Sequence, residues 1–322
     1  MRTLEAKFKI VTPMFISGAD QTEAELRVPS IKGMLRFWWR AVNYIKDNKE
    51  LLEKESQIFG SSNDKIGQSK VQIQLIDAKT KDKKDKKIAS KWKVSDWKSY
   101  VGYGLSEDLR EKDGKKGDKK NELHRSYLEE SVEFTIQCIS KTESALNELV
   151  PAIKMFGLLG GLGSRSRKGW GSVAISDFKY DNSNSWKVPQ TREEYIHELK
   201  SIIEGIQVEE QPVYSAFSKK TEIRVGKSYP TYEGAFKEIA TKYKDYIKGL
   251  KDKKNREDFG LPRKEISEER RASPVMLHIH QAGNEFFWVC VFMNSKFLPS
   301  RNATDNYKAV LEFMNYIGGE KL

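Results

Sequence analysis

Glycine and positive charge are concentrated in residues 156–171 (FGLLGGLGSRSRKGWG), and this stretch constrains the fold more than any other. Its last fifteen residues contain six glycines, three cations and no acidic residue. Glycine adopts positive φ angles and lets another molecule approach the backbone closely. Consecutive exposed N–H groups in such a loop form a concavity that binds anions. We therefore predict a loop here, and the cations Arg165, Arg167 and Lys168 indicate a ligand that carries phosphate.

The spacing of this glycine loop excludes two common nucleotide-binding loops. The G-x-x-x-x-G-K-[ST] pattern of nucleoside triphosphate loops is absent. Residues 172–180, which follow the loop, alternate like a strand, whereas a dinucleotide fingerprint opens a helix. The alternative is a glycine-rich turn before a strand, with its cations in solvent.

Residues 28–45 (VPSIKGMLRFWWRAVNYI) have the strongest helical pattern in the chain. Their apolar residues recur at i, i+3, i+4 and i+7, which predicts a buried stripe, and Ser30 is the expected N-cap. A second face of this helix collects three cations and one indole: Lys32, Arg36, Trp39 and Arg40. Such a face suits a nucleic-acid backbone and a stacked base. The alternative is an exposed cationic face whose Trp39 packs on a neighbouring domain.

Six segments in the first half of the chain predict the order β-α-β-β-α-β. The four strands are expected at residues 4–11, 71–77, 131–140 and 172–180, and the two helices at 30–45 and 142–159. This order is the ferredoxin-like pattern, in which two helices cover one face of a four-stranded antiparallel sheet. RNA-recognition modules share the pattern.

The second half follows a linker at residues 181–189 (DNSNSWKVP). After a connecting helix at 191–206, the patterns predict strands at 221–225, 274–281 and 286–293 and helices at 235–250 and 304–317. This β-α-β-β-α order is an incomplete or modified copy of the first. We therefore expect an α+β protein of two tandem ferredoxin-like domains, residues 1–182 and 183–322.

A lysine-rich segment at about residues 78–125 interrupts the first predicted domain. It contains 16 Lys and Arg against 9 Asp and Glu, so it carries +7 of the total net charge of +11. Two runs in it, TKDKKDKK and EKDGKKGDKKNE, lack the apolar residues that packing needs and are predicted to be mobile loops. Between them, Trp92, Trp97, Tyr100 and Tyr103 indicate one ordered patch. The segment is either solvated or contacts RNA or a neighbouring subunit.

The overall charge favours a polyanionic partner, with nucleic acid ahead of an anionic membrane. Lys and Arg outnumber Asp and Glu by 57 to 46, and the sequence pI is about 9.3. No stretch approaches the roughly 20 apolar residues of a membrane span, and the first residues have no apolar signal core. Cys138 and Cys290 lie in apolar strand-like runs, where we expect reduced core residues. A cytoplasmic location is expected.

Four motifs together resemble the RAMP superfamily of CRISPR proteins. The glycine loop GGLGSRSRKGWG follows the second helix, and Pro29-Ser30-x-Lys32-Gly33-x-Leu35-Arg36 opens the first. The FWWRA run at 37–41 and RRASPVMLHI at 270–279 look like the branch that supplies the first RAMP subunit of the type III-B (Cmr) effector complex. The resemblance covers nearly the whole chain but not the lysine-rich segment.

This resemblance implies a subunit of a complex that uses a guide RNA to silence complementary RNA. Its partners would be the guide RNA near its 3′ end, the target RNA and other Cmr subunits, with no membrane and no cofactor or metal. A different, repeated subunit cuts the target in that family. The implied RNA contacts lie on the first helix, on the loop and in the later motif: Lys32, Arg36, Trp39, Arg40, Ser164, Arg165, Ser166, Arg167, Lys168, Arg270 and Arg271.

Some RAMP proteins are metal-independent endoribonucleases, and such chemistry needs a positioned acid and base. His278 and His280 alternate on one strand and face the same way, but no third metal ligand accompanies them. His197 is expected in solvent on a helix, and His124 is the best catalytic candidate if one exists. We therefore predict a non-catalytic RNA-binding subunit. The alternatives are an endoribonuclease that processes guide RNA and a scaffold whose basic surface serves protein partners only.

Overall fold

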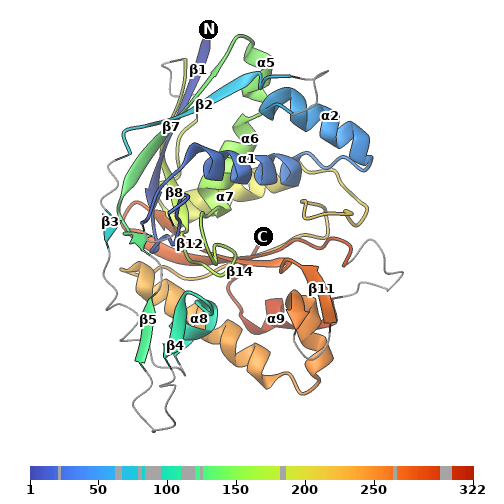
Figure 1. The fold of residues 1–322 in the computed structure, drawn as a ribbon. Coiled ribbons are helices and arrows are strands. Elements are labelled where there is room, and N and C mark those ends of the chain that lie inside the picture. Colours follow the sequence, from blue (N-terminus) through green and yellow to red (C-terminus); the bar gives the residue numbers. More distant parts are fainter. Residues whose placement is uncertain are drawn as a thin grey trace.

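The computed structural model describes residues 1–20, 23–61, 67–78, 82–83, 96–109, 120–123, 126–181, 186–263, 267–297 and 307–322. The protein is a mixed α and β chain with two antiparallel four-stranded sheets. Figure 1 shows α1, α6 and α7 between the two sheets, and α8 and α9 on the far side of the second sheet. The layers are therefore sheet, helices, sheet, helices.

The first sheet forms from the four strands that the first half predicts. They are β1 (Arg2–Ile10), β2 (Val71–Ile76), β7 (Glu133–Ser140) and β8 (Val173–Tyr180), in the order β2-β7-β1-β8. Side chains alternate between faces along a strand, so Leu4, Phe8 and Ile10 are buried on the face that meets the helices. The ring of Phe8 lies 5.0 Å from that of Phe156 in α6 (Val150–Leu159).

Helix α1 (Val28–Val42) forms at the predicted place but begins earlier and ends three residues earlier than residue 45. The earlier start is possible because Pro29 fits the first turn of a helix. Its N-cap is Arg27 rather than Ser30. The helix predicted at 142–159 is instead two helices, α5 (Glu143–Asn147) and α6. Pro151 explains the break, since its ring clashes with the carbonyl four residues back.

Helix α2 (Asn48–Phe59) was not predicted from the sequence. It packs on α1 and buries Glu55, Ser56, Ile58 and Phe59. A signal for its start was present, because Asp47 precedes Glu50 by three residues, as in a capping box. In the structure the Asp47 carboxylate accepts a hydrogen bond of 2.8 Å from the Glu50 backbone N–H.

The second sheet has the strand order β12-β13-β9-β14. Its strands are β9 (Glu222–Val225), β12 (Val275–Ala282), β13 (Glu285–Phe292) and β14 (Glu320–Lys321). Helices α8 (Tyr232–Gly249) and α9 (Lys308–Tyr316) cover one face, and α7 (Arg192–Glu204) packs on the other. Because both faces are covered, the strands are buried nearly throughout instead of alternating.

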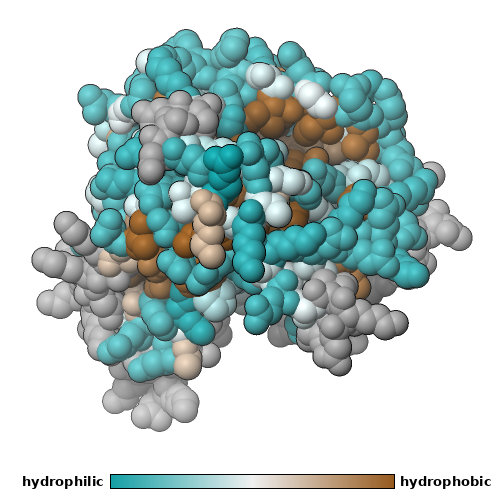
Figure 2. Space-filling view, turned by 90° about the horizontal axis from the view of Figure 1, so that it is seen from above, coloured by the Kyte–Doolittle hydropathy of each residue, from teal (hydrophilic) through white to brown (hydrophobic). Residues whose placement is uncertain are grey.

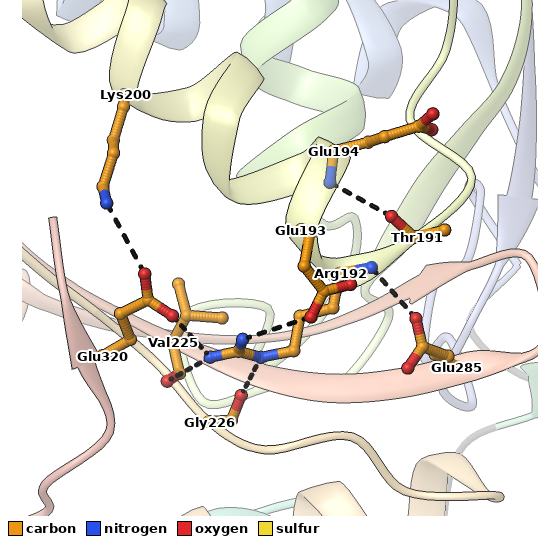
Figure 3. A network of polar contacts seen from close by, with 9 residues as sticks. All are labelled: Thr191, Arg192, Glu193, Glu194, Lys200, Val225, Gly226, Glu285 and Glu320. Atoms are coloured by element: carbon orange, nitrogen blue, oxygen red, sulfur yellow. Dashed lines mark hydrogen bonds and ion pairs between the residues drawn. The ribbon is translucent and has the colours of Figure 1, made fainter.

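Strand β14 was not predicted from the sequence, since two residues carry no readable periodicity. Arg192 holds it in place: its Nη2 lies 3.1 Å from a Glu320 carboxylate oxygen, and its Nε donates to the Gly226 carbonyl at 2.6 Å (Figure 3). Lys200 adds a second contact to Glu320 at 3.5 Å. The start of α7 thereby ties β14 to β9.

The lysine-rich segment is described only in part. It contributes α4 (Trp97–Val101) and the short strands β3 (Asp82–Lys83), β4 (Ser106–Leu109) and β5 (Lys120–Leu123). The remaining short elements of the chain are β6 (Tyr127–Leu128), the 3-10 helix η1 (Lys253–Phe259), β10 (Leu261–Arg263) and β11 (Ser267–Arg271). Most of the two lysine runs, and Trp92, lie outside the described residues.

Two of the four aromatic residues predicted to form an ordered patch, Trp97 and Tyr100, are packed, whereas Tyr103 is exposed and Trp92 lies outside the described residues. The ring of Trp97 lies 4.9 Å from Phe236 of α8, and the ring of Tyr100 lies 6.2 Å from Tyr243. Helix α4 is therefore packed on the second half of the chain, although it belongs by sequence to the first.

The two halves share their apolar cores. Phe217 and Val289 belong to the same buried cluster as Phe8 and Leu35, so the helical layer packs on both sheets. Cys138 and Cys290 are free and fully buried, as predicted, and burial raises the pKa of Cys138 to about 12. Seen from above, the surface is mostly hydrophilic, with smaller hydrophobic areas (Figure 2). No helix among the described residues is long and apolar enough to span a membrane.

Candidate nucleic-acid interface

The glycine loop connects α6 to β8 and packs tightly against the chain that follows β1. Gly163 and Gly171 have φ angles of +83° and +62°. A Cβ on Gly163 would lie 2.4 Å from the Phe15 carbonyl oxygen, and a Cβ on Gly171 would lie 2.0 Å from that of Leu162. These two glycines are therefore required by close backbone approaches within the protein.

Several N–H groups of the loop already donate to protein carbonyls. Ser164 donates to Phe15 at 2.8 Å, Lys168 to Arg165 at 2.8 Å and Gly171 to Pro13 at 2.9 Å. The prediction of an anion site made by successive loop N–H groups is not supported at these positions, because their hydrogen bonds are internal. At these three positions a ligand would be bound by side chains rather than by backbone N–H groups.

The loop also joins the first sheet to the second. Leu277 of β12 donates its N–H to the Arg167 carbonyl at 3.0 Å, and Ile279 donates to the Ser172 hydroxyl at 3.2 Å. Since β12 is the edge strand of its sheet, the loop covers part of an otherwise open edge. The cations of the loop are thus fixed at the junction of the two halves.

The three loop cations have different surroundings. Arg165 is exposed, and its guanidinium carbon lies 5.9 Å from the centre of the Tyr103 ring. Arg167 donates to the Ser273 carbonyl at 2.8 Å, and burial together with nearby Arg271 lowers the pKa of Arg167. Lys168 Nζ lies 2.5 Å from the Tyr243 hydroxyl and 4.1 Å from the centre of its ring.

These side chains line a groove of about 840 Å³ between the glycine loop, α4 and the second half of the chain. Its described lining contains four cations, three tyrosines and three serines, and no carboxylate: Arg165, Arg167, Lys168, Arg271, Tyr100, Tyr103, Tyr243, Ser99, Ser166 and Ser273. Cations bind phosphate oxygens, and aromatic rings stack on bases. We call this surface the tyrosine groove.

The two arginines of β11 diverge, as neighbours on a strand do. Arg271 lines the tyrosine groove and lies 4.9 Å from the Phe297 ring centre and 5.2 Å from that of Tyr307. It also donates to the Tyr307 hydroxyl. Arg270 is exposed and is not part of the groove lining. Arg271 thus has a packing role as well as a place in the groove.

The cationic face predicted for α1 is partly covered by α2. Glu55 of α2 is only 5% exposed and lies 3.0 Å from Arg36 Nε and 3.1 Å from Arg40 Nη1. Arg36 also donates to the Gly60 carbonyl at 2.8 Å. We call Arg36, Arg40 and Glu55 the helix ion cluster. Both arginines neutralise a buried carboxylate, which explains why they lie on this face.

Trp39 is buried, contrary to the expectation of an indole on an open basic face. It is 2% exposed, and its ring packs edge-on against Phe59 at 6.4 Å. An aromatic side chain with this burial belongs to the apolar core between α1 and α2. Trp39 is therefore closed to a stacking base in this arrangement.

Lys32 lies apart from the other predicted contacts. It lines a second hollow, of about 850 Å³, together with Lys70 and Lys141, and burial followed by the charge of Arg36 lowers its pKa. No residue of α1 is in the described lining of the tyrosine groove. The wall expected from α1 is instead supplied by α4, which brings Tyr100 to the groove and positions the following Tyr103.

The paired histidines of β12 are a core feature. His278 Nε2 lies 3.3 Å from His280 Nδ1, both residues are 2% exposed, and the ring of Tyr195 lies 4.3 Å from that of His280. Burial lowers the pKa of His278 to about 3 and lowers that of His280 well below its usual value. Both imidazoles are therefore neutral near pH 7 and closed to an RNA substrate.

The other two histidines are His197 and His124. His197 is exposed on α7, as predicted, and His124 lies outside the described residues. Over the part of the chain that the structure describes, no group of three or more His, Cys, Asp or Glu side chains is placed to bind a metal.

Comparison with known proteins agrees with the motifs. A family model described as the RAMP superfamily matches residues 7–174, which is about half of the chain. The chain belongs to the RAMP superfamily.

Among its relatives are two Cmr subunits of Pyrococcus furiosus. The CRISPR system Cmr subunit Cmr1-2 is 33% identical over 177 residues, which cover 51% of this chain and 90% of the relative. The CRISPR system Cmr subunit Cmr1-1 is 26% identical over 303 residues, covering 85% of this chain and 82% of the relative.

Solved structures share the fold. The crystal structure of Cmr1 from Pyrococcus furiosus in its apo form has a TM-score of 0.64 at 21% identity and covers 99% of each chain. A chain of a type III-B Cmr-beta assembly bound to cognate target RNA has a TM-score of 0.60 at 13% identity, over 98% of this chain and 99% of that one. The motif-based family prediction is confirmed.

Proposed function

We propose that the protein is a non-catalytic, cytoplasmic RNA-binding subunit of a type III-B CRISPR effector complex, and that RNA lies in the tyrosine groove. The observation that carries this proposal is the composition of the groove, with four cations and three tyrosines and no carboxylate in its described lining. A polyanion gains affinity there by releasing its counterions. The groove replaces the cleft against α1 that the sequence had indicated.

The relatives support the choice of partner. Two of them are named as Cmr subunits, and one chain of the same fold comes from an assembly bound to target RNA. The partners proposed here are the guide RNA near its 3′ end, the target RNA and other Cmr subunits. The direct RNA contacts would come from residues that line the groove: Arg165, Ser166, Arg167, Lys168 and Arg271.

We further propose that the two sheets are the cores of tandem ferredoxin-like domains, residues 1–182 and 183–322. Both sheets place the second strand of their unit at one edge, then the third, the first and the fourth. In the first half these strands are β2, β7, β1 and β8, and in the second β12, β13, β9 and β14. In each unit a helix follows the first strand and another follows the third: α1 and α6 in the first half, α8 and α9 in the second.

The absence of catalysis is a proposal based on the histidines. Metal-independent RNA cleavage needs a group that takes a proton and a group that donates one. His278 and His280 are buried, and His197 is on α7, outside the lining of the tyrosine groove. The alternative, an endoribonuclease that processes guide RNA, rests on His124.

Titration of a labelled single-stranded RNA with the purified protein, followed by fluorescence anisotropy, tests the binding proposal. We expect Arg165→Glu to weaken binding about tenfold or more, because an exposed cation becomes an anion beside phosphate. Lys187→Glu is the matched control, since Lys187 is 80% exposed and lies outside the groove lining. Equal affinities of Arg165→Glu and the unsubstituted protein would contradict the site.

Incubation with a repeat-containing RNA in EDTA tests the alternative function. We expect intact RNA. Cleavage at one site that His124→Ala abolishes would establish the endoribonuclease instead.

A further inference from the structure

Tyr103 is an aromatic side chain that the core does not use. Its relative exposure is 77%, higher than that of any other aromatic residue among the exposed large hydrophobic residues of the described chain. The neighbouring apolar residues of the same segment are buried, with Trp97 at 7%, Val101 at 3% and Leu105 at 1%. An exposed aromatic ring beside a cationic groove is suited to stack on the base of a bound nucleic acid.

A tight turn fixes the position of Tyr103. Leu105 donates its N–H to the Gly102 carbonyl at 2.9 Å, so Tyr103 and Gly104 are the two central residues of a turn. Gly104 has a φ of +82°, which is the value at the third residue of a type II turn and favours glycine. Buried Val101 and Leu105 flank this turn, so the ring is displayed from an anchored backbone.

Arg165 lies beside the ring, and Gly104 makes room for it. The Arg165 guanidinium carbon is 5.9 Å from the Tyr103 ring centre. A Cβ at position 104 would lie 3.1 Å from Arg165 Nη2, and the positive φ disfavours any other residue there. Arg165 itself has a φ of +63°, which is uncommon for a residue other than glycine. Such conformations persist where the surroundings impose them, often at binding sites.

The other two tyrosines of the groove face cations inside the protein. Lys168 Nζ lies 4.1 Å from the Tyr243 ring centre, and Lys248 Nζ lies 5.9 Å from that of Tyr100. Tyr100 is only partly exposed, and Tyr243 is buried at 4%. Tyr103 therefore offers the most open ring surface of the three, at the rim, while Arg167, Lys168 and Arg271 lie along the groove.

We propose that Tyr103 is a base-stacking site, where one unpaired RNA base lies on the open ring and Arg165 binds the adjoining phosphate. This inference rests on the proposed function. Bases inside a duplex already stack on each other, so the site takes single-stranded RNA. Every base has a π-face, so the site tolerates any sequence. Gly104 leaves room for the Arg165 guanidinium beside the ring.

The test uses the full chain and a single-stranded RNA with 2-aminopurine placed at successive positions. We expect the fluorescence of one position to be quenched on binding and the quenching to disappear in Tyr103→Ala. The Kd of this variant should rise about tenfold, with an unchanged dependence on salt, because stacking releases no counterions. Tyr103→Trp should retain both quenching and affinity.

Tyr316→Ala is the matched control, since Tyr316 is 52% exposed on α9 and does not line the groove. Its affinity should equal that of the unsubstituted protein. Gly104→Ala should weaken binding as Tyr103→Ala does, with thermal unfolding recorded to exclude loss of fold. An RNA duplex of equal length should bind Tyr103→Ala and the unsubstituted protein alike.

Two results would overturn the inference, and they differ from failure of the proposed function. If Tyr103→Ala binds RNA normally while Arg165→Glu does not, the groove binds RNA without stacking, and the exposed ring serves a protein partner. If no position of the RNA is quenched, no base lies on the ring. If the unsubstituted protein binds no RNA even at low salt, the proposed function itself is wrong.

Discussion

Two groups of arginines and lysines, both predicted from the sequence as RNA contacts, differ in what surrounds them. In the helix ion cluster, Arg36 and Arg40 lie 3.0 Å and 3.1 Å from the buried carboxylate of Glu55. Among the described contacts of the loop cations, Arg165 and Lys168 lie over the rings of Tyr103 and Tyr243, and Arg167 lies over the Phe37 ring and donates to the Ser273 carbonyl. A cation that already neutralises a carboxylate gains less from a phosphate. We therefore propose that the nearest described carboxylate, rather than the local density of cations, decides which group binds RNA.

The largest expected effect is a loss of stability at Trp39, which lies beside the helix ion cluster on α1. Trp39→Ala removes a 2% exposed indole from its contact with Phe59 and should lower the free energy of unfolding by about 3–5 kcal/mol. Denaturant unfolding followed by circular dichroism measures this change. Trp39→Phe, which keeps an aromatic ring, should lose less and should bind RNA normally. If Trp39→Ala kept full stability but bound RNA more weakly, Trp39 would be an RNA contact after all.

A smaller effect is expected at the centre of the helix ion cluster. Glu55→Gln keeps the shape of the side chain but removes its charge, and should cost about 1–2 kcal/mol of unfolding free energy. The cost is limited because Arg36 and Arg40 are 35% and 38% exposed and can be hydrated. RNA affinity should stay within about twofold. A large gain in affinity would mean that Glu55 masks a second RNA surface on α1.

The smallest expected effect is on the salt dependence of RNA affinity, which should differ between the two groups of cations. Arg165→Ala should reduce the slope of log affinity against log salt by about 0.7, the value for one phosphate contact on a single strand. Arg36→Ala should leave the slope unchanged and lower stability instead. Titrations at four or more salt concentrations measure both slopes. Equal reductions would remove the distinction between the loop and the helix ion cluster.

The sequence predicted those parts of the fold that depend on local periodicity. Alternation in β1 and the apolar stripe of α1 were readable because each element buries one face. The glycine loop was also predicted, but the sequence did not show why glycine is required at positions 163 and 171. Gly163 is required by the Phe15 carbonyl, which approaches from the chain after β1, and Gly171 is required by the Leu162 carbonyl at the other end of the same loop.

What the sequence could not predict depends on contacts between distant segments. Glu55 reaches Arg36 and Arg40 only because α2 folds back on α1, and Trp39 is buried for the same reason. Tyr103 reaches the glycine loop only because α4 packs on α8. Two-residue strands such as β14 leave no pattern and are fixed by side chains far away, as Glu320 is by Arg192.

The tyrosine groove has walls from three distant parts of the chain, which include Tyr100, Arg165 and Arg271. A strand of RNA that contacts all three would hold the two halves together without a covalent bond. Its binding free energy then adds to the free energy of unfolding, by about 2.7 kcal/mol when free RNA is at a hundred times its Kd. The RNA-bound protein should accordingly resist heat and proteolysis better than the free protein. Resistance of this kind would let a cell remove subunits that hold no RNA.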